Sequence, residues 1–75
     1  MADKLLDARN LMCPMPVLKT RKAMAELAKG QTLELLATDP GSVADVTAFC
    51  QSSGNVLVEQ GEADGVYRFV LERKV

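Results

Sequence analysis

Hydrophobic and polar positions repeat along this chain with two different periods. Residues 32–37 and 66–72 carry apolar side chains at alternate positions, which predicts strands that bury one face. Residues 16–28 repeat apolar side chains at helical spacing, with charged side chains largely on the other side. The expected elements are a strand at 5–8, a helix at 16–28, a strand at 32–37, a helix ending near 53, and strands at 56–60 and 66–72. The predicted order is therefore β-α-β-α-β-β.

Turn-forming residues separate these elements. A glycine follows each helical pattern, at the position where a left-handed backbone conformation is favoured. The second helix opens within residues 39–42. We favour Asp39 as its capping residue with Pro40 in the first helical position, and the alternative is a cap by Ser42. Residues 61–65 form a glycine-containing loop that predicts a hairpin between the last two strands.

Two amphipathic helices and four strands have one simple arrangement in a chain of 75 residues. Both helices pack on the same face of a four-stranded mixed sheet, which gives a two-layer α/β (α+β) sandwich. No repeat, linker or low-complexity tract divides residues 1–75, so we expect a single domain. The order of the strands within the sheet does not follow from the pattern.

The composition argues against several classes of protein. The chain has no histidine and two cysteines, too few for a structural zinc site, and we expect neither a metal nor a cofactor. The first residues form no apolar signal segment, and no apolar run is long enough to cross a bilayer. We therefore expect a cytoplasmic protein with reduced thiols and no membrane contact.

Charge is unevenly distributed, although the net charge is −1. Residues 1–30 carry six basic and three acidic side chains, whereas residues 31–75 carry three basic and seven acidic ones. This excess is too weak to indicate a nucleic-acid surface. The simpler interpretation is the solvated face of a lysine-rich helix, and the alternative is a basic rim that steers an acidic partner.

The candidate chemistry lies in the segment Cys13-Pro14-Met15-Pro16. Proline suits the first turn of a helix, where N–H groups have no intrahelical partner, and it favours an extended residue before it. Pro14 and Pro16 are therefore predicted to mark and stiffen the helix start, with Cys13 at the N-cap. Because a helix N-terminus stabilises anions, we expect a lowered pKa for Cys13 and a thiolate or persulfide anion beside free backbone amides.

The rest of the sequence limits what this cysteine can do. Without histidine there is no Cys–His pair for acyl transfer, and the motif is not the Cys-x-x-Cys of dithiol exchange. Carrying sulfane sulfur between larger enzymes needs only one cysteine of low pKa. The alternative is that Cys13 is merely a small apolar residue in a proline-rich loop.

Residues 6–18, Leu-Asp-Ala-Arg-Asn-Leu-Met-Cys-Pro-Met-Pro-Val-Leu, resemble the signature of the TusA-like (SirA-like) sulfur-carrier family. Asp39-Pro40 and Phe49-Cys50 are also similar to the family, and the resemblance covers essentially the whole chain. It implies a βαβαββ sandwich and a persulfide relay, in which Cys13 accepts sulfur from a cysteine desulfurase or another sulfurtransferase and passes it on. Asn10 stands where the family usually has glycine, and asparagine tolerates positive φ, so we expect the turn to be kept.

Five other residues are candidates for a part in the site. Cys50 could resolve a persulfide on Cys13, but its position on the apolar side of a helix favours a buried small hydrophobe. Met12 and Met15 flank the cysteine and form either an apolar patch for a partner or ordinary packing under the loop. Arg21 and Lys22, one to two turns into the helix, are candidates for docking an acidic partner.

The leading prediction is a sulfur carrier that acts as a stoichiometric relay rather than an autonomous catalyst. The resemblance allows transfer-RNA thiolation, molybdenum-cofactor supply or oxidation of inorganic sulfur, with a sulfur-accepting protein complex as acceptor, and the sequence does not select among them. One alternative is a non-catalytic protein-interaction or regulatory module. Another is an RNA-binding domain, against which the near-neutral charge and three aromatic residues argue. A carrier that docks into successive partners works most simply as a monomer, and we expect no direct nucleic-acid contact.

Overall fold

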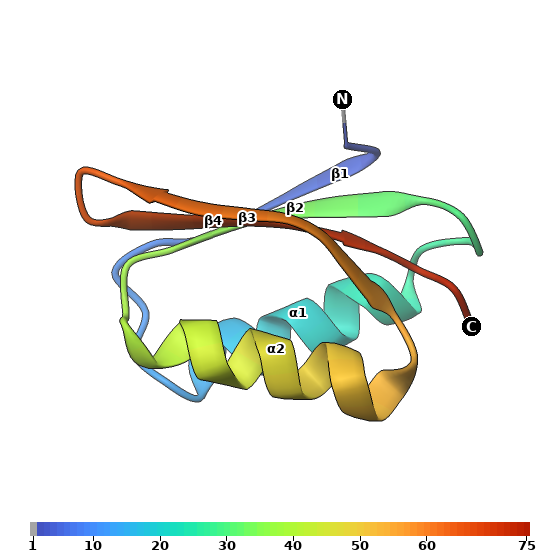
Figure 1. Cartoon of the computed structure of the whole chain (residues 1–75), viewed down its shortest axis with the longest axis horizontal. Helices are drawn as coiled ribbons and strands as arrows, with labels where there is room; N and C mark the ends of the chain where they lie inside the picture. Colours follow the sequence, from blue (N-terminus) through green and yellow to red (C-terminus); the bar gives the residue numbers. More distant parts are fainter. Residues whose placement is uncertain (1) are drawn as a thin grey trace.

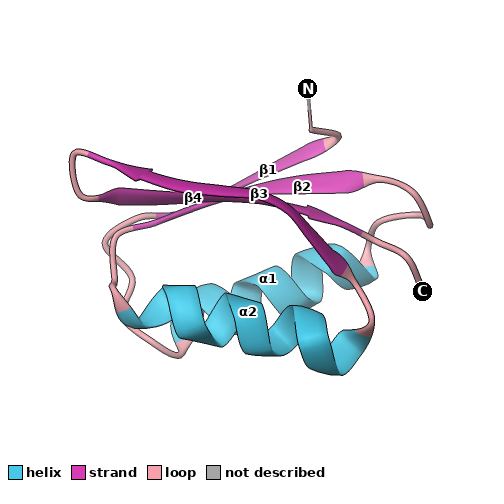
Figure 2. Cartoon of the chain, in the orientation of Figure 1, coloured by secondary structure: helices cyan, strands magenta, loops and turns pink. Residues whose placement is uncertain are grey.

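A sheet forms one layer of the molecule and two helices cover one of its faces (Figures 1 and 2). The computed structural model describes residues 2–75. The elements are β1 (Lys4–Ala8), α1 (Met15–Ala25), β2 (Thr32–Ala37), α2 (Gly41–Ser53), β3 (Val56–Ala63) and β4 (Val66–Glu72). The predicted βαβαββ order and two-layer arrangement are therefore confirmed.

The strands lie in the order β1-β2-β4-β3, which the sequence pattern did not supply. β1 and β2 are parallel, and Ala8 and Ala37 form the last pair of their register. The two other pairings, β2 with β4 and β3 with β4, are antiparallel, so the sheet is mixed. Because two parallel strands end at the same edge, the chain enters both α1 and α2 from one end of the sheet.

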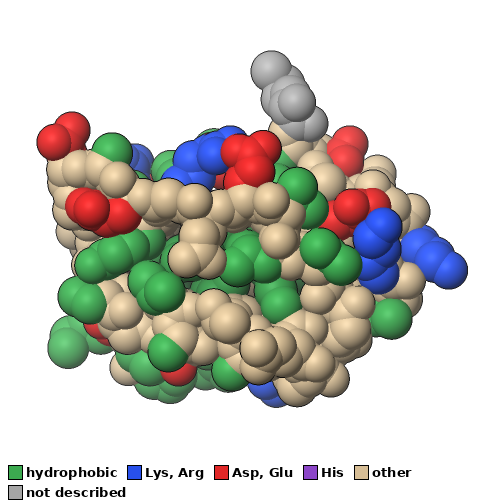
Figure 3. Space-filling model, in the orientation of Figure 1, with side chains coloured by type: hydrophobic (Ala, Val, Ile, Leu, Met, Phe, Trp, Pro, Cys, Tyr) green, Lys and Arg blue, Asp and Glu red, His purple; other side chains and the backbone are tan. Residues whose placement is uncertain are grey.

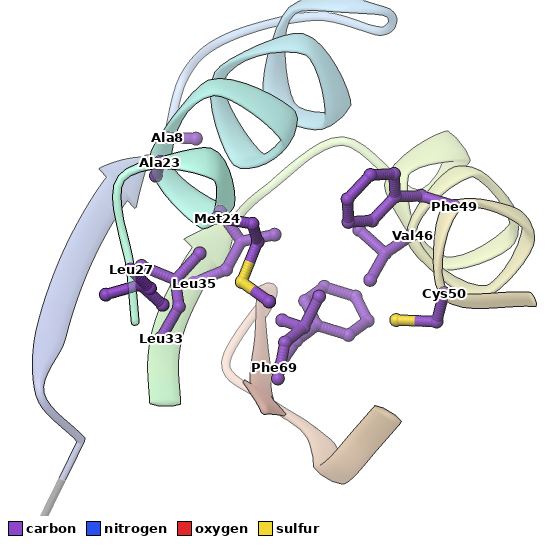
Figure 4. Close-up of a cluster of buried hydrophobic side chains, with 11 residues drawn as sticks. Ala8, Ala23, Met24, Leu27, Leu33, Leu35, Val46, Phe49, Cys50 and Phe69 are labelled. Carbon is purple, nitrogen blue, oxygen red and sulfur yellow. The ribbon is translucent and has the colours of Figure 1, made fainter. Parts of the chain in front are cut away.

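Side chains from both layers meet in one hydrophobic core (Figure 4). The cluster contains Ala8, Ala23, Met24, Leu27, Leu33, Leu35, Val46, Phe49, Cys50, Phe69 and Leu71. Leu35 and Phe69 are partners in the β2–β4 register and are almost completely buried. Each such large apolar side chain contributes about 1.5–3 kcal/mol by its burial. On the side drawn in Figure 3, hydrophobic side chains are visible between the two layers.

The first helix is shorter than the predicted 16–28. It begins at Met15 and ends at Ala25, and Ala28, expected on its buried side, is exposed. Arg73, beyond the last strand, explains this end, because its Nη1 donates to the carbonyl oxygens of Met24, Ala25 and Leu27 at 3.0, 2.9 and 2.6 Å. Met24 O also accepts the N–H of Leu27 at 3.2 Å, but among the described bonds the carbonyls of Ala25 and Leu27 have Arg73 as their donor, and carbonyls at a helix end otherwise lack intrahelical partners. The contact spans almost fifty residues, so periodicity could not indicate it.

The second helix begins at Gly41 and its N-cap is Pro40, so the cap lies one residue after the favoured Asp39 and not at Ser42. Pro40 already has helical backbone angles, and Asp39 Oδ1 accepts a hydrogen bond from the Gly41 N–H at 3.0 Å. Ser42 is instead buried, and its hydroxyl donates to the carbonyl oxygen of Asp39 at 2.6 Å. The helix ends at Ser53, and Gly54 follows with a φ of 86°, as the glycine pattern predicted.

The β3–β4 connection is tighter than the predicted loop at 61–65. β3 continues to Ala63, which pairs with Val66, so Asp64 and Gly65 alone form the turn. Their φ values of 54° and 80° belong to a type I′ turn, whose twist matches that of the adjoining strands. The glutamates in the segment hid the strand, because charged residues at an exposed edge do not alternate with apolar ones.

Candidate functional site

Two loops meet at the end of the sheet where β1 and β2 finish. Asn10, in the β1–α1 loop, has a φ of 69°, so the expected positive-φ turn is present. Its N–H donates to Thr38 Oγ1 at 2.8 Å, and the N–H of Cys13 donates to Asp39 Oδ2 at 2.5 Å. The β1–α1 loop is thus fixed to the β2–α2 loop at two points, which sets the position of Cys13.

The start of α1 differs by one residue from the prediction for Cys13. The helix begins at Met15 and its N-cap is Pro14, so Cys13 precedes the cap rather than occupying it. Pro14 and Pro16 do lie in the first turn, and Pro16 is buried, with its carbonyl oxygen accepting a bond from Thr20 Oγ1 at 2.8 Å.

The thiol of Cys13 is exposed and points across to the second helix. Its Sγ donates a hydrogen bond to Oδ2 of Asp45, in the second turn of α2. This bond raises the pKa of Cys13, and partial loss of hydration and the negative charges of Asp45 and Asp39 raise it further. The expected lowering of this pKa is therefore wrong for the free protein. Two carboxylates outweigh the helix N-terminus, because the sulfur lies one residue outside the cap.

Asp39 holds the other side of the cysteine. Its carboxylate accepts from the backbone N–H groups of Cys13 and Gly41, and these bonds lower the pKa of Asp39. Asp39 therefore carries its negative charge at neutral pH. Sequence reasoning proposed Asp39 only as a helix cap and missed Asp45 as a partner of Cys13. Asp45 and Cys13 come together because β1 and β2 pair in parallel, and the sequence does not reveal that pairing.

A groove between α1 and α2 opens beside the thiol. Its volume is about 360 Å³. It is lined by Cys13, Pro14, Val17, Arg21, Asp45, Ala48, Phe49 and Ser52. The guanidinium carbon of Arg21 lies 5.9 Å from the centroid of the Phe49 ring, within cation–π range. The groove therefore has apolar walls, an acid beside the sulfur and one arginine.

The structure separates the other predicted residues. Met12 and Met15 are 78 % and 42 % exposed, so neither is packed under the loop. Arg21 lines the groove together with Cys13, whereas Lys22 lines a different depression, formed with β1. Cys50 is a buried member of the core, where burial raises its pKa (Figure 4). Its predicted place as a small hydrophobe is confirmed.

The described residues form neither a metal-binding cluster nor a membrane-spanning helix. Within residues 2–75, no three or more Cys, Asp or Glu side chains are arranged to hold a metal ion. No helix in the same range is long and apolar enough to cross a membrane.

Comparison with known proteins assigns the chain to a family. The model of the family described as sulfurtransferase TusA matches residues 4–73. The chain belongs to the TusA family. The sulfur carrier protein TusA of Allochromatium vinosum is 42 % identical to it over 95 % of this chain and 93 % of that protein. The sulfur carrier protein TusA of Pseudomonas aeruginosa is 40 % identical over 96 % of this chain and 91 % of that protein.

A solved structure agrees with the TusA assignment. The crystal structure of a SirA-like protein from Desulfitobacterium hafniense superimposes with a TM-score of 0.85 and 27 % identity. The alignment covers 96 % of this chain and 99 % of that one. The resemblance found from residues 6–18 is therefore confirmed at the level of the family and of the fold.

Proposed function

We propose that this TusA family member is a sulfur carrier that holds sulfane sulfur as a persulfide on Cys13. The observation that carries the proposal is the exposed thiol of Cys13 at the mouth of an apolar groove. Membership of a family whose relatives are named sulfur carriers supports it. The other cysteine, Cys50, is buried in the core and is not accessible to a partner.

The transfer step needs no oxidant or reductant from outside. The thiolate of Cys13 attacks the outer sulfur of a donor persulfide, a new S–S bond forms at Cys13, and the S–S bond of the donor breaks. The donor cysteine leaves as a thiolate and takes up the proton that Cys13 lost. Transfer to an acceptor is the same step with the roles exchanged. The chain is then a stoichiometric relay rather than an autonomous catalyst.

The donor and acceptor classes proposed here are those that the resemblance to the TusA family implies. The donor is a cysteine desulfurase or another sulfurtransferase, and the acceptor is a sulfur-accepting protein complex in transfer-RNA thiolation, molybdenum-cofactor supply or sulfur oxidation. Thiols must stay reduced for this exchange, which supports a cytoplasmic location. A monomer leaves the Cys13 face free for each partner in turn.

The surroundings of Cys13 suggest how partners dock. Met12 and Met15 offer exposed, adaptable apolar surface beside the sulfur. Arg21 adds a positive charge on the groove side of α1. Lys22 is a weaker candidate than the sequence indicated, because it lines a depression on the β1 side.

Intact-mass spectrometry after incubation with a cysteine desulfurase and free cysteine tests the proposal. The wild-type chain should gain the mass of one sulfur atom and lose it on reduction. Cys50→Ser is the matched control and should load as the wild type does, whereas Cys13→Ser should not load. Loading of Cys13→Ser, or no gain by the wild type with donors of both classes, would reject the proposal. The second result would favour the non-catalytic interaction module.

A further inference from the structure

Two carboxylates hold Cys13 from different directions. Asp39 accepts the backbone N–H of Cys13 at 2.5 Å, and Asp45 accepts the hydrogen bond donated by its Sγ. Asp39 also accepts the N–H of Gly41, the first residue of α2, so it has a structural role of its own. Among the described residues, Asp45 accepts no hydrogen bond from the backbone of a helix start. Its described side-chain hydrogen bond is the one donated by the sulfur of Cys13. Its side chain, half-buried on α2, faces the same groove as Cys13.

We propose that Asp45 is a positioning residue for the sulfur site, whose carboxylate holds the Sγ–H of Cys13 and aims the sulfur into the groove between α1 and α2. The inference rests on the proposed function for its biological meaning, since it concerns the same sulfur atom. It adds a state of the carrier: before a partner docks, Cys13 is kept as a thiol.

The physical argument compares Asp45 with water as the acceptor of the thiol proton. A hydrogen bond to a charged acceptor is about twice as strong as one between neutral groups. Loss of the proton would remove this bond and place a second negative charge beside the carboxylate of Asp45. The thiolate is the reactive form of cysteine, so the arrangement lowers the reactivity of the free carrier at neutral pH.

Two other charged groups near the sulfur affect the balance between the thiol and thiolate forms of Cys13. Asp39, in the β2–α2 loop, carries a negative charge that also disfavours the thiolate. Arg21, on α1, lines the same groove and has the opposite sign, but it lies over the ring of Phe49. Of these three residues, Asp45 is the one with a described hydrogen bond to the sulfur, so a change at Asp45 should have the largest effect on Cys13.

The test measures how fast Cys13 reacts with a neutral dipyridyl disulfide as a function of pH. A Cys50→Ala background leaves Cys13 as the only thiol, and circular dichroism checks that each variant is folded. Asp45→Asn keeps the shape of the side chain and removes its charge. Glu72→Gln is the matched control, because it also removes one negative charge. Glu72 is the last residue of β4 and pairs with Thr32, at the end of β2 that lies away from Cys13.

The expected result is a pair of crossing rate profiles. For each unit by which Asp45→Asn lowers the pKa of Cys13, the thiolate becomes about tenfold more abundant at neutral pH but about threefold less nucleophilic. The variant should therefore react about threefold faster at neutral pH and about threefold slower at the alkaline plateau. Asp45→Glu keeps the negative charge, so its rates at neutral pH and at the alkaline plateau should stay close to those of the wild type. Glu72→Gln should match the wild type at both.

Profiles of Asp45→Asn that match the wild type at both ends, or an equal change in Glu72→Gln, would overturn the inference. Should Asp45→Asn fail to fold, the Cys13 side-chain NMR shift of the wild type decides, since a titration midpoint at or below that of a free cysteine also overturns it. The disulfide reagent requires no sulfur donor. A carrier that fails to load but shows crossing profiles therefore refutes only the proposed function, and one that loads without crossing refutes only this inference.

Discussion

The backbone N–H of Cys13 donates to Oδ2 of Asp39 at 2.5 Å and joins two loops whose residues are 26 positions apart. Asp39 Oδ1 meanwhile accepts from the Gly41 N–H, so one oxygen of this carboxylate holds the β1–α1 loop and the other holds the first residue of α2. The position of the cysteine therefore depends on the start of α2, although the cysteine itself precedes α1.

The first prediction concerns Asp39 and acid. Its two backbone hydrogen bonds hold its pKa below the usual 3.8, so its stabilising effect is present above that value and is lost as the pH falls through the folded-state pKa. Asp39→Asn, which cannot titrate, should lose less stability on acidification than the wild type. Urea midpoints at neutral pH and at about pH 3 measure this.

Asp39→Ala is the companion variant, because it removes both acceptors. It should lower the urea midpoint at neutral pH more than Asp39→Asn does. An equal drop on acidification in the wild type and in Asp39→Asn would show that the Asp39 bonds do not stabilise the fold.

The second prediction concerns the turn between β3 and β4. Gly65 has a φ of 80°, and a Cβ built there meets no atom within 4 Å, so a side chain would be strained by the backbone alone. Gly65→Ala should lower the free energy of unfolding by about 1–2 kcal/mol. Gly61 has the same open space without a positive φ, so Gly61→Ala should change stability by less than about 0.5 kcal/mol. Equal effects of the two alanines in urea denaturation would refute the strain argument.

The third prediction concerns Arg73, whose Nη1 donates to three carbonyl oxygens at and beyond the end of α1. Arg73→Met keeps much of the side-chain length but leaves these carbonyls without their charged donor, which should cost about 1–3 kcal/mol in urea denaturation. Amide exchange should also accelerate in the last turn of α1. Arg73→Lys keeps the charge but has no planar guanidinium group, so its free energy of unfolding should lie between those of the wild type and Arg73→Met. Unchanged exchange in Arg73→Met would show that the helix end does not depend on this contact.

The sequence was sufficient where local patterns determine structure. The alternation in residues 32–37 and 66–72 gave β2 and β4 with their observed bounds, and Gly54 marked the end of α2. It failed where distant residues meet. The end of α1 depends on Arg73, and the environment of Cys13 depends on Asp45, which the parallel β1–β2 pairing brings within hydrogen-bonding distance. Helix-dipole reasoning gave the wrong direction for the cysteine pKa for the same reason.

The last prediction separates two neighbouring basic residues that the sequence treated as a pair. Arg21 lines the groove with Cys13, and its guanidinium lies 5.9 Å from the centroid of the Phe49 ring. Lys22 lines the depression on the β1 side instead. A partner that reaches the sulfur along the groove must contact the first residue and not the second.

Arg21→Glu should therefore weaken binding to a sulfur-donating partner by about two- to tenfold at low salt, and Lys22→Glu, which changes the net charge equally, should have little effect. Salt screens charge interactions over about 10 Å at 0.1 M, so the difference between the variants should shrink as the salt concentration rises. Titration calorimetry with a cysteine desulfurase at two salt concentrations measures both quantities. Equal losses of affinity in the two variants would mean that the partner responds to the overall charge of α1. A loss of affinity confined to Lys22→Glu would place the docking surface on the β1 side, away from the groove.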